Sequence, residues 1–396
     1  MRHGENNSLD LNAYDPYPDI RTAVSKVCEQ FDMDYWSRCD EEGRLASEFL
    51  DAMRRGGWLG ICMPEEFGGS GLGIAAASTL IQTVAAHGGG WTATGALLAY
   101  IYAPYALVVH GNAEQKQRIL APMVRGESRM CFAITEPNTG LDTTRLRTRA
   151  VRDCDHYVMN GEKVWITGAH ISDYMMIAAR TKPIEDTVKP IDGITLFCTK
   201  IDRNHVRISP IKKHGYNSIA SNELFITDLN VPVADRIGEE GKGFRYLIDS
   251  INPERILVAA SAVGVARYAI ARAAGYAKER VVFDRPIGQN QSIQHPLAQC
   301  WMETEAANLM MFRAANLYDA QLPCAAEANA AKYLSAEAVY SACRQAVVTH
   351  GGFGYAREFH VERLLRESLI ATLAPVGQNL VKSFIAERVL GLPKSY

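Results

Sequence analysis

The spacing of apolar residues divides the chain into three zones. In the first zone, up to about residue 130, apolar side chains recur at helical intervals, as they do at Leu45, Phe49 and Met53. This pattern stops at Gly56-Gly57, and a second amphipathic stretch covers residues 114–126. Such intervals are typical of helices that bury one face, so the first zone is predicted to be helical.

From about residue 131 to 237 the pattern changes to short β-prone runs between turn residues. Three of these runs cover residues 173–181, 193–201 and 222–231. In the run 157–166, Asn160-Gly161 predicts a two-residue hairpin turn, because a type I′ turn needs positive φ angles. A compact β-domain fits this zone.

Long helical patterns return from about residue 240 onward. One pattern continues from residue 254 to 280 without a break, and others cover 327–348 and 379–392. The predicted order is therefore helical, β and helical again, which is an α+β fold. We expect domains at residues 1–130, 131–238 and 239–396.

Net charge and hydropathy give no indication of a nucleic-acid-binding or membrane-spanning protein. The chain has 396 residues and a net charge of -2, so no overall field favours nucleic acid or an anionic membrane. Residues 88–109 carry no charge, but Pro104 interrupts them. Their apolar part is shorter than the roughly 18 residues that a membrane span needs. We therefore expect a buried core helix there and no membrane span.

The cysteines and the N-terminus both favour a cytoplasmic protein. The nine cysteines show no CxxC pair and no zinc-like spacing, which is typical of reduced thiols. The first 15 residues are polar and acidic, and they resemble neither a secretory nor an organellar presequence.

Several common catalytic motifs are missing from the sequence. It contains no GxGxxG, no GxxxxGK[ST], no HExxH and no GxSxG string. A Rossmann nicotinamide enzyme, a P-loop NTPase and an α/β-hydrolase are therefore disfavoured.

Two strings in the β-zone have a chemistry that secondary structure alone does not require. CFAITEPNTGLDTT, residues 131–144, is a strand that leads into a polar loop able to present N–H groups and Thr hydroxyls to a flat ring. VWIT, residues 164–167, alternates so that Trp165 and Thr167 share one face of a strand. The alternative for both strings is an ordinary β-core with a surface loop.

Two further strings lie in the C-terminal helical zone. In YAKERVVFDRPIGQNQSIQ, Arg280 and Phe283 lie three positions apart, and Arg280 either binds a pyrophosphate or complements a helix dipole. The glycines of THGGFGY allow the close approach of a ligand, or they form a turn between helices.

The order of these strings resembles that of the acyl-CoA dehydrogenase family. The matching strings run from about Met63 onward and are MPEEFGGSGLG, HGNAEQKQRILAPMVRGE, AITEPNTG, NGEKVWITGA, GKGF, YAKERVVFDRPI, HGGFGY and VERLLRE. The resemblance implies an N-terminal helical domain, a middle β-barrel and a C-terminal four-helix bundle. It also implies FAD as cofactor, an acyl-CoA substrate, and a homo-oligomer, dimer or tetramer, whose subunits share each site.

The resemblance further implies which residues hold the cofactor and the substrate. Flavin contacts within one subunit are expected from Phe132, Ile134, Thr135, Leu141, Trp165, Thr167 and Asn379. Contacts with the FAD of a neighbouring subunit are expected from Arg280, Phe283, Gln291, Gly351 and Gly352. The GKGF segment, residues 241–244, would open the helix that carries the substrate-facing residues, and Arg255 and Tyr100 are expected to contact the substrate.

The reaction that the resemblance implies needs a base for an α-hydrogen of the acyl group. Most members of the family take this base from a Tyr-Glu-Gly-Thr string near the C-terminus. Here Leu373-Ala374-Pro375-Val376-Gly377 replaces that string and has no carboxylate. Isovaleryl-type and long-chain-type members carry a Glu-Arg pair on the first long helix of the bundle, which matches Glu254-Arg255. We therefore predict Glu254 as the base.

Local sequence gives Glu254 a second interpretation. With Asn252 as N-cap and Pro253 in the first helical turn, Glu254 would stabilise a helix dipole without any catalytic task. Pro375 raises a separate question. In the family, a backbone N–H at that position helps bind the thioester oxygen, and proline has none. Leu141 and Val348 also replace a Ser and a Gln of the family pattern.

Three functions remain compatible with the sequence. The leading prediction is FAD-dependent α,β-dehydrogenation of an acyl-CoA with a branched or bulky acyl chain, with electrons passed to an electron-transferring flavoprotein. A flavin acyl-CoA oxidase on the same fold would instead let O₂ reach the reduced flavin. An inactive partner subunit of a hetero-oligomer is the third, and the departures at Pro375, Leu141 and Val348 point to it.

Overall fold

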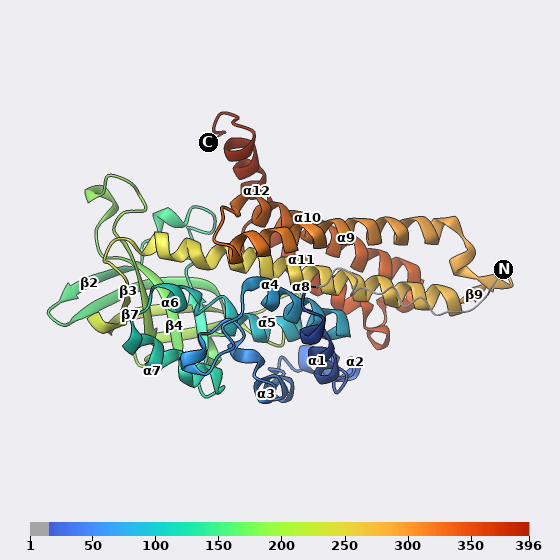
Figure 1. The fold of residues 1–396 in the computed structure, drawn as a ribbon, viewed down its shortest axis with the longest axis horizontal. Coiled ribbons are helices and arrows are strands. Elements are labelled where there is room, and N and C mark those ends of the chain that lie inside the picture. The colour runs from blue at the N-terminus through green and yellow to red at the C-terminus, as the bar shows by residue number, and fades with distance from the viewer. Residues whose placement is uncertain (1–15, 396) are drawn as a thin grey trace.

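A computed structural model describes residues 16–395 as helices, then strands, then helices (Figure 1). The predicted α+β order is confirmed. The helices of the first zone are α1 (Pro18–Cys28), α2 (Met33–Glu41), α3 (Ser47–Arg55), α4 (Ile74–Val84), α5 (Gly90–Ile101), α6 (Tyr105–His110) and α7 (Ala113–Val124). Local sequence explains the start of α7, because Asn112 and Gln115 exchange side-chain to backbone hydrogen bonds in a capping box.

The middle zone forms one sheet of eight strands. They are β1 (Met130–Ala133), β2 (Arg149–Asp153), β3 (His156–Thr167), β4 (Tyr174–Arg180), β5 (Ile194–Lys200), β6 (Val206–Ile211), β7 (Ser221–Pro232) and β8 (Arg236–Ile237). Their order is β6-β7-β3-β2-β4-β5-β8, and β1 pairs with β4 in parallel. This sheet has an apolar core of its own, separate from the core that the helices share.

The predicted hairpin turn at Asn160-Gly161 is wrong. Both residues lie inside β3, which pairs with β2 and β7 along its length. Gly161 is needed for a different reason: a Cβ atom there would lie 2.5 Å from Thr148 Oγ1. The hairpin turn lies instead between β2 and β3, where Cys154 has a φ of 52°.

The third zone is a bundle of long helices beside the sheet (Figure 1). Its elements are α8 (Gly243–Glu279), the small strands β9 (Val281–Val282) and β10 (Arg285–Pro286), α9 (Gln291–Asp319), α10 (Ala325–His350), α11 (Val361–Leu373) and α12 (Gln378–Phe384). Helices α8, α9, α10 and α11 pack on one another, as a four-helix bundle requires.

Helix α8 opens within the GKGF segment, as the resemblance implied, and earlier than the helical pattern that starts at residue 254. It starts at Gly243, where a Cβ atom would lie 2.3 Å from the backbone nitrogen of Leu196. Asn252 and Pro253 are therefore interior residues, and their predicted role as a helix start is wrong. A proline leaves the carbonyl four residues earlier without its helical donor. That carbonyl, of Asp249, accepts a hydrogen bond of 2.9 Å from Tyr318 Oη on α9.

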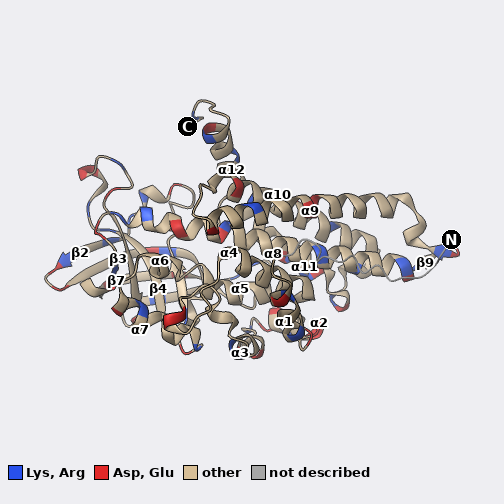
Figure 2. Cartoon of the chain, in the orientation of Figure 1, with Lys and Arg blue, Asp and Glu red and all other residues tan. Residues whose placement is uncertain are grey.

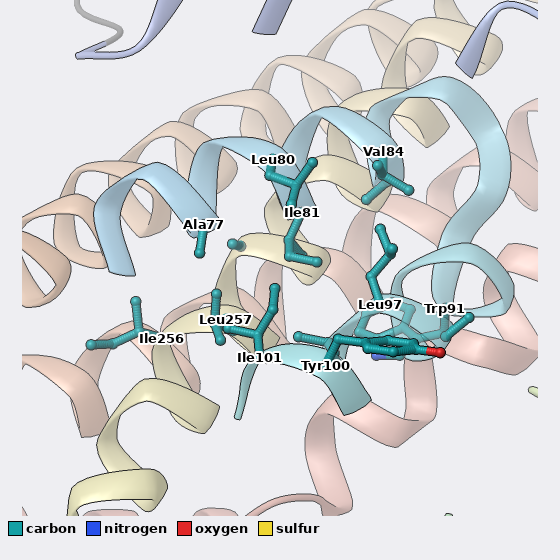
Figure 3. Close-up of a cluster of buried hydrophobic side chains, with 14 of the residues drawn as sticks. Ala77, Leu80, Ile81, Val84, Trp91, Leu97, Tyr100, Ile101, Ile256 and Leu257 are labelled. Carbon is teal, nitrogen blue, oxygen red and sulfur yellow. The ribbon is translucent and has the colours of Figure 1, made fainter. Parts of the chain in front are cut away.

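The N-terminal helices and the bundle share one apolar core (Figure 3). Figure 3 shows the α8 residues Ile256 and Leu257 beside side chains of α4 and α5. Both residues are fully buried. This packing fixes the rotation of α8 about its axis, and the preceding residues, Glu254 and Arg255, line a cavity at the same helix.

Two helical stretches are long and apolar enough to cross a membrane by length and composition, Ile74–His110 and Gly243–Glu279. A bent pair, Val361–Leu373 with Gln378–Val389, would add a third. The protein buries 72% and 67% of the apolar windows of the first two, which supports their interpretation as core helices. Charged residues of both signs occur beside one another in the sheet and the helices (Figure 2).

Candidate active site

A cavity of about 530 Å³ lies where the sheet, α5, α8 and the segment after α11 meet. Side chains from all three zones of the chain line it. The helical side contributes Trp91, Gly95, Leu98 and Tyr102 from the region of α5, and Phe244, Leu247, Ile251, Glu254, Arg255 and Val258 from α8. Tyr216, from the loop between β6 and β7, completes this side. Such a largely apolar cavity with few polar groups is typical of a small-molecule site.

Glu254 is the carboxyl group on the helical side of this cavity, and the other lining carboxyl, Asp142, is paired with Arg145 on the loop after β1. Glu254 forms no hydrogen bond and no ion pair with the residues that the structure describes. Burial raises the pKa of Glu254 to about 7, and the neighbouring Arg255 only partly offsets this effect. A carboxyl group with a pKa near neutrality can accept a proton from a weak acid more readily than an ordinary glutamate can.

Arg255 lines the same cavity and lies next to Glu254 in the chain. One of its terminal nitrogens donates to Asn252 Oδ1 at 3.0 Å, while its buried Nε has no partner among the described residues. Burial lowers the pKa of Arg255, and the charge of Glu254 opposes that shift. Arg255, which was predicted to contact the substrate, therefore lies at the cavity with an unpaired N–H donor.

The opposite wall of the cavity comes from β1, β3 and the loop after β1. Its side chains include Phe132, Ile134, Thr135, Leu141, Trp165 and Thr167, six of the residues for which the resemblance implied flavin contacts. A bulge in β3 gives Trp165 a φ of 62° and leaves 58% of the residue exposed. The hydroxyls of Thr135 and Thr167 donate to no residue in the described range. An indole beside free hydroxyl groups fits a planar ring with polar edges, such as a flavin.

A buried ion pair supports this wall. Lys163 and Glu136 approach to 2.9 Å with side-chain exposures of 0% and 5%. Lys163 Nζ also donates to the carbonyl groups of Ile134 and Ala178, and Glu136 accepts the N–H groups of residues 147–148. The pair therefore ties the loop after β1 to β3 and β4, which a precise binding wall needs.

Some predicted cofactor contacts lie far from this cavity. The Arg280 guanidinium lies 5.8 Å from the centre of the Phe353 ring, and a Cβ on Gly351 would meet no atom within 4 Å. Phe283 is 93% exposed, and Figure 1 places the adjacent β9 at the end of α8 opposite the sheet. The residues absent from the cavity lining are Arg280, Phe283, Gln291, Gly351 and Gly352. These residues were predicted to contact the FAD of a neighbouring subunit, and their position outside the cavity is compatible with that prediction.

Two other predicted contacts also lie outside the cavity lining. Tyr100 is 3% exposed, and its hydroxyl accepts a hydrogen bond of 3.2 Å from Arg129 Nε. Tyr102 lines the cavity in its place, because two positions along a helix turn a side chain to a different face. Asn379 is exposed on α12, while Leu380 of the same helix lines the cavity.

The segment that replaces the usual catalytic string also reaches the cavity. Ala374, Pro375 and Val376 all line it. Lys332, with 0% exposure, holds this segment from α10 by donating to the carbonyls of Thr372 at 3.4 Å and Val376 at 2.5 Å. The N–H of Val376 donates to no described residue, so a backbone donor remains free at the cavity one position after the proline.

Sequence reasoning did not identify Lys332, Gly95 or Tyr216 as residues of the site. Each matters through a contact with a residue far away in the chain. The signals that could have indicated them were a lysine, Lys332, within an apolar helical pattern and a glycine, Gly95, within the uncharged stretch 88–109.

Family models match the chain in three consecutive parts. The acyl-CoA dehydrogenase N-terminal domain matches residues 17–127, the middle domain 131–229 and the C-terminal domain 241–390.

Individual relatives match over nearly the whole chain. Acyl-CoA dehydrogenase FadE12 of Mycobacterium tuberculosis is 34% identical over 384 residues, which cover 95% of this chain and 96% of that protein. The caffeyl-CoA reductase-Etf complex subunit CarC of Acetobacterium woodii is 32% identical over 357 residues, or 89% of this chain and 91% of that protein. A solved structure described as an FAD complex of PigA has a TM-score of 0.88 and 26% identity, and covers 99% of this chain and 100% of its own.

Proposed function

Because the chain belongs to the acyl-CoA dehydrogenase family, we propose that it removes two hydrogens from the Cα–Cβ bond of an acyl-CoA, with Glu254 as the base. The protein is a flavin-dependent oxidoreductase whose cofactor is FAD. One observation supports the assignment of the base above all others. Glu254 is a carboxyl group without a protein partner, and it shares its cavity with the wall of Phe132, Thr135 and Trp165.

The proposed chemistry divides between the base, the oxygen donors and the cofactor. Bound FAD supplies an acceptor for the hydride that leaves Cβ. Glu254 takes the proton from Cα, and the low polarity that raises its pKa also makes it a stronger base. A hydrogen-bond donor on the thioester oxygen stabilises the negative charge that develops there. The free N–H of Val376 is our candidate for the donor that Pro375 cannot supply.

The activity should depend on pH through Glu254. Its pKa of about 7 means that the carboxylate, which is the active form, predominates only above that pH. We expect kcat/KM to rise about tenfold per pH unit below pH 7 and to level above it. The measurement is kcat/KM with one acyl-CoA across this range. A profile that is already flat well below pH 6 would assign the base to another group.

We infer that reduced flavin passes its electrons to an electron-transferring flavoprotein. The name of the A. woodii relative associates that protein with an Etf complex. The enzyme, reduced anaerobically by an acyl-CoA, should be reoxidised rapidly by electron-transferring flavoprotein and only slowly by air. Rapid peroxide formation on admission of air would instead identify an oxidase. A colourless purified protein would identify the inactive subunit.

We also propose a homo-oligomer in which each FAD contacts two subunits. The exposed positions of Arg280, Phe283 and Gly351 support this arrangement, because these residues do not line the cavity of their own chain. The nine free cysteines support a cytoplasmic location, where thiols stay reduced. The domain boundaries near residues 130 and 238 remain our proposal, and the first 15 residues lie outside the described range.

A branched or bulky acyl chain is our proposal for the substrate. Because the proposed base lies on α8, the segment at Ala374 and Pro375 does not carry the glutamate of the usual family pattern. No long side chain projects from that segment, which leaves room for a bulky acyl chain. Anaerobic bleaching of the flavin by straight and β-methyl acyl-CoA esters tests this proposal, and equal rates would contradict it.

A further inference from the structure

Tyr216 lines the cavity directly beside a glycine of α5. It is 7% exposed and lines the cavity together with Gly95. A Cβ atom on Gly95 would lie only 1.7 Å from Tyr216 Oη. The phenol therefore occupies the space that any side chain at position 95 would need, and the two residues form one complementary contact.

The backbone of Tyr216 is held in an unfavourable conformation. Its φ is 60°, which is rare for a bulky residue and points to a function at this position. Lys213 Nζ fixes the loop by donating to the carbonyls of Tyr216 at 2.7 Å and Ile219 at 2.8 Å. The N–H of Asn217 donates to Asp40 Oδ1 at 2.9 Å, which anchors the loop to α2. These bonds hold the backbone that carries the phenol, and the contact with Gly95 places the ring against α5.

The hydroxyl of Tyr216 has no hydrogen-bond partner among residues 16–395, and neither has that of Tyr102. The hydroxyls of other partly buried tyrosines do have such partners: Tyr157 donates to Glu240, and Tyr318 donates to the Asp249 carbonyl. Tyr102 packs edge-on against Phe132 with 5.7 Å between ring centres, so its ring is also fixed.

The two free hydroxyls share the cavity with the base. The pKa of Tyr102 lies well above 10, chiefly because the residue is buried, and the charges of Glu254 and Tyr216 raise it further. Tyr102, Tyr216 and Glu254 all line this one cavity, which places the three groups around the same space. Buried polar groups are normally hydrogen-bonded, so free hydroxyls in a binding cavity indicate a polar ligand group.

We propose that Tyr216 limits the length of the acyl group by closing the cavity against Gly95, and that the hydroxyls of Tyr216 and Tyr102 bind an oxygen atom of that group. The substrate class is then a short acyl-CoA with a hydroxyl or carbonyl oxygen beyond Cβ. This inference rests on the proposed function, since it assigns a substrate to the same cavity.

The test compares 4-hydroxybutyryl-CoA with pentanoyl-CoA, which has a methyl group in place of the hydroxyl. In the FAD-loaded enzyme, Tyr216→Phe should lower kcat/KM on the hydroxylated ester by about tenfold or more, because the hydroxyl of the acyl group then loses its hydrogen-bond partner. Its kcat/KM on pentanoyl-CoA should change less than about twofold. Tyr105→Phe, a tyrosine that packs against Tyr318 outside the cavity lining, is the matched control.

A second variant tests the length limit. Tyr216→Ala should raise the ratio of kcat/KM on octanoyl-CoA to that on pentanoyl-CoA by about tenfold. If this variant does not retain FAD, Tyr216→Leu takes its place. Equal losses on both short esters in Tyr216→Phe, or an unchanged chain-length ratio, would overturn the inference. If no acyl-CoA bleaches the flavin of the unmodified enzyme, the proposed function fails instead.

Discussion

Glu254→Gln is expected to slow the bleaching of the flavin by acyl-CoA by about 10²–10⁴-fold while FAD stays bound. Glutamine has nearly the same shape as glutamate, but it cannot accept the proton from Cα. Glu254 bonds to no described residue, so the substitution breaks no contact that supports the cofactor wall. The measurement is the rate of anaerobic flavin reduction after rapid mixing with substrate.

A glutamate outside the cavity lining provides the control for this experiment. Glu327 lies in the first turn of α10, and its side chain accepts two 3.4 Å hydrogen bonds from the exposed Arg313. Glu327→Gln should reduce the flavin at the unmodified rate. Bleaching at that same rate in Glu254→Gln would show that another group takes the proton, and the interpretation of the raised pKa as catalytic would be wrong.

Glu367→Gln is expected to lower the free energy of unfolding by about 3–5 kcal/mol, because it leaves a buried arginine without its counter-ion. Glu367 and Arg363 form an ion pair of 2.8 Å with side-chain exposures of 0% and 1%. Glu367 also accepts hydrogen bonds from the N–H of Trp91 and the hydroxyl of Thr92. The glutamate thus joins α11 to the first turn of α5.

Chemical denaturation of the FAD-loaded variants at one protein concentration measures this effect. The control is Glu127→Gln, because the pair of Glu127 with Arg125 is more than half exposed at 56% and 55%. Such exposed pairs contribute about 0–1 kcal/mol. A loss of similar size in both variants would mean that water compensates Arg363 in the folded protein.

The three zones could be predicted because apolar periodicity follows directly from the buried faces of helices and strands. Local turn chemistry was less reliable. Asn160-Gly161 has the composition of a hairpin turn, yet the glycine is needed because Thr148 approaches it from a neighbouring segment. Asn252-Pro253 has the composition of a helix start, yet α8 continues through it, because Tyr318 satisfies the carbonyl that the proline leaves free.

The candidate site was predictable to a similar extent. Phe132, Thr135 and Trp165 could be named from their strings, and they line one cavity, while their contact with a flavin stays a prediction. The contact between residues 95 and 216 at this cavity could not be predicted, because no local pattern encodes it. The positive φ of Tyr216 is likewise imposed by bonds to Lys213 and Asp40 and is not a preference of tyrosine.

The distance between the two groups of cofactor residues has a consequence for the behaviour of the enzyme in dilute solution. Arg280 ends α8 just before β9, which lies at the opposite end of that helix from the sheet (Figure 1), and its guanidinium lies near the Phe353 ring. In the proposed oligomer, each FAD contacts two subunits. A separated subunit would keep its own contacts with FAD but would lose those that the neighbouring subunit makes with the same FAD. Retention of the yellow cofactor and assembly of the subunits then become one equilibrium, so that each stabilises the other by mass action.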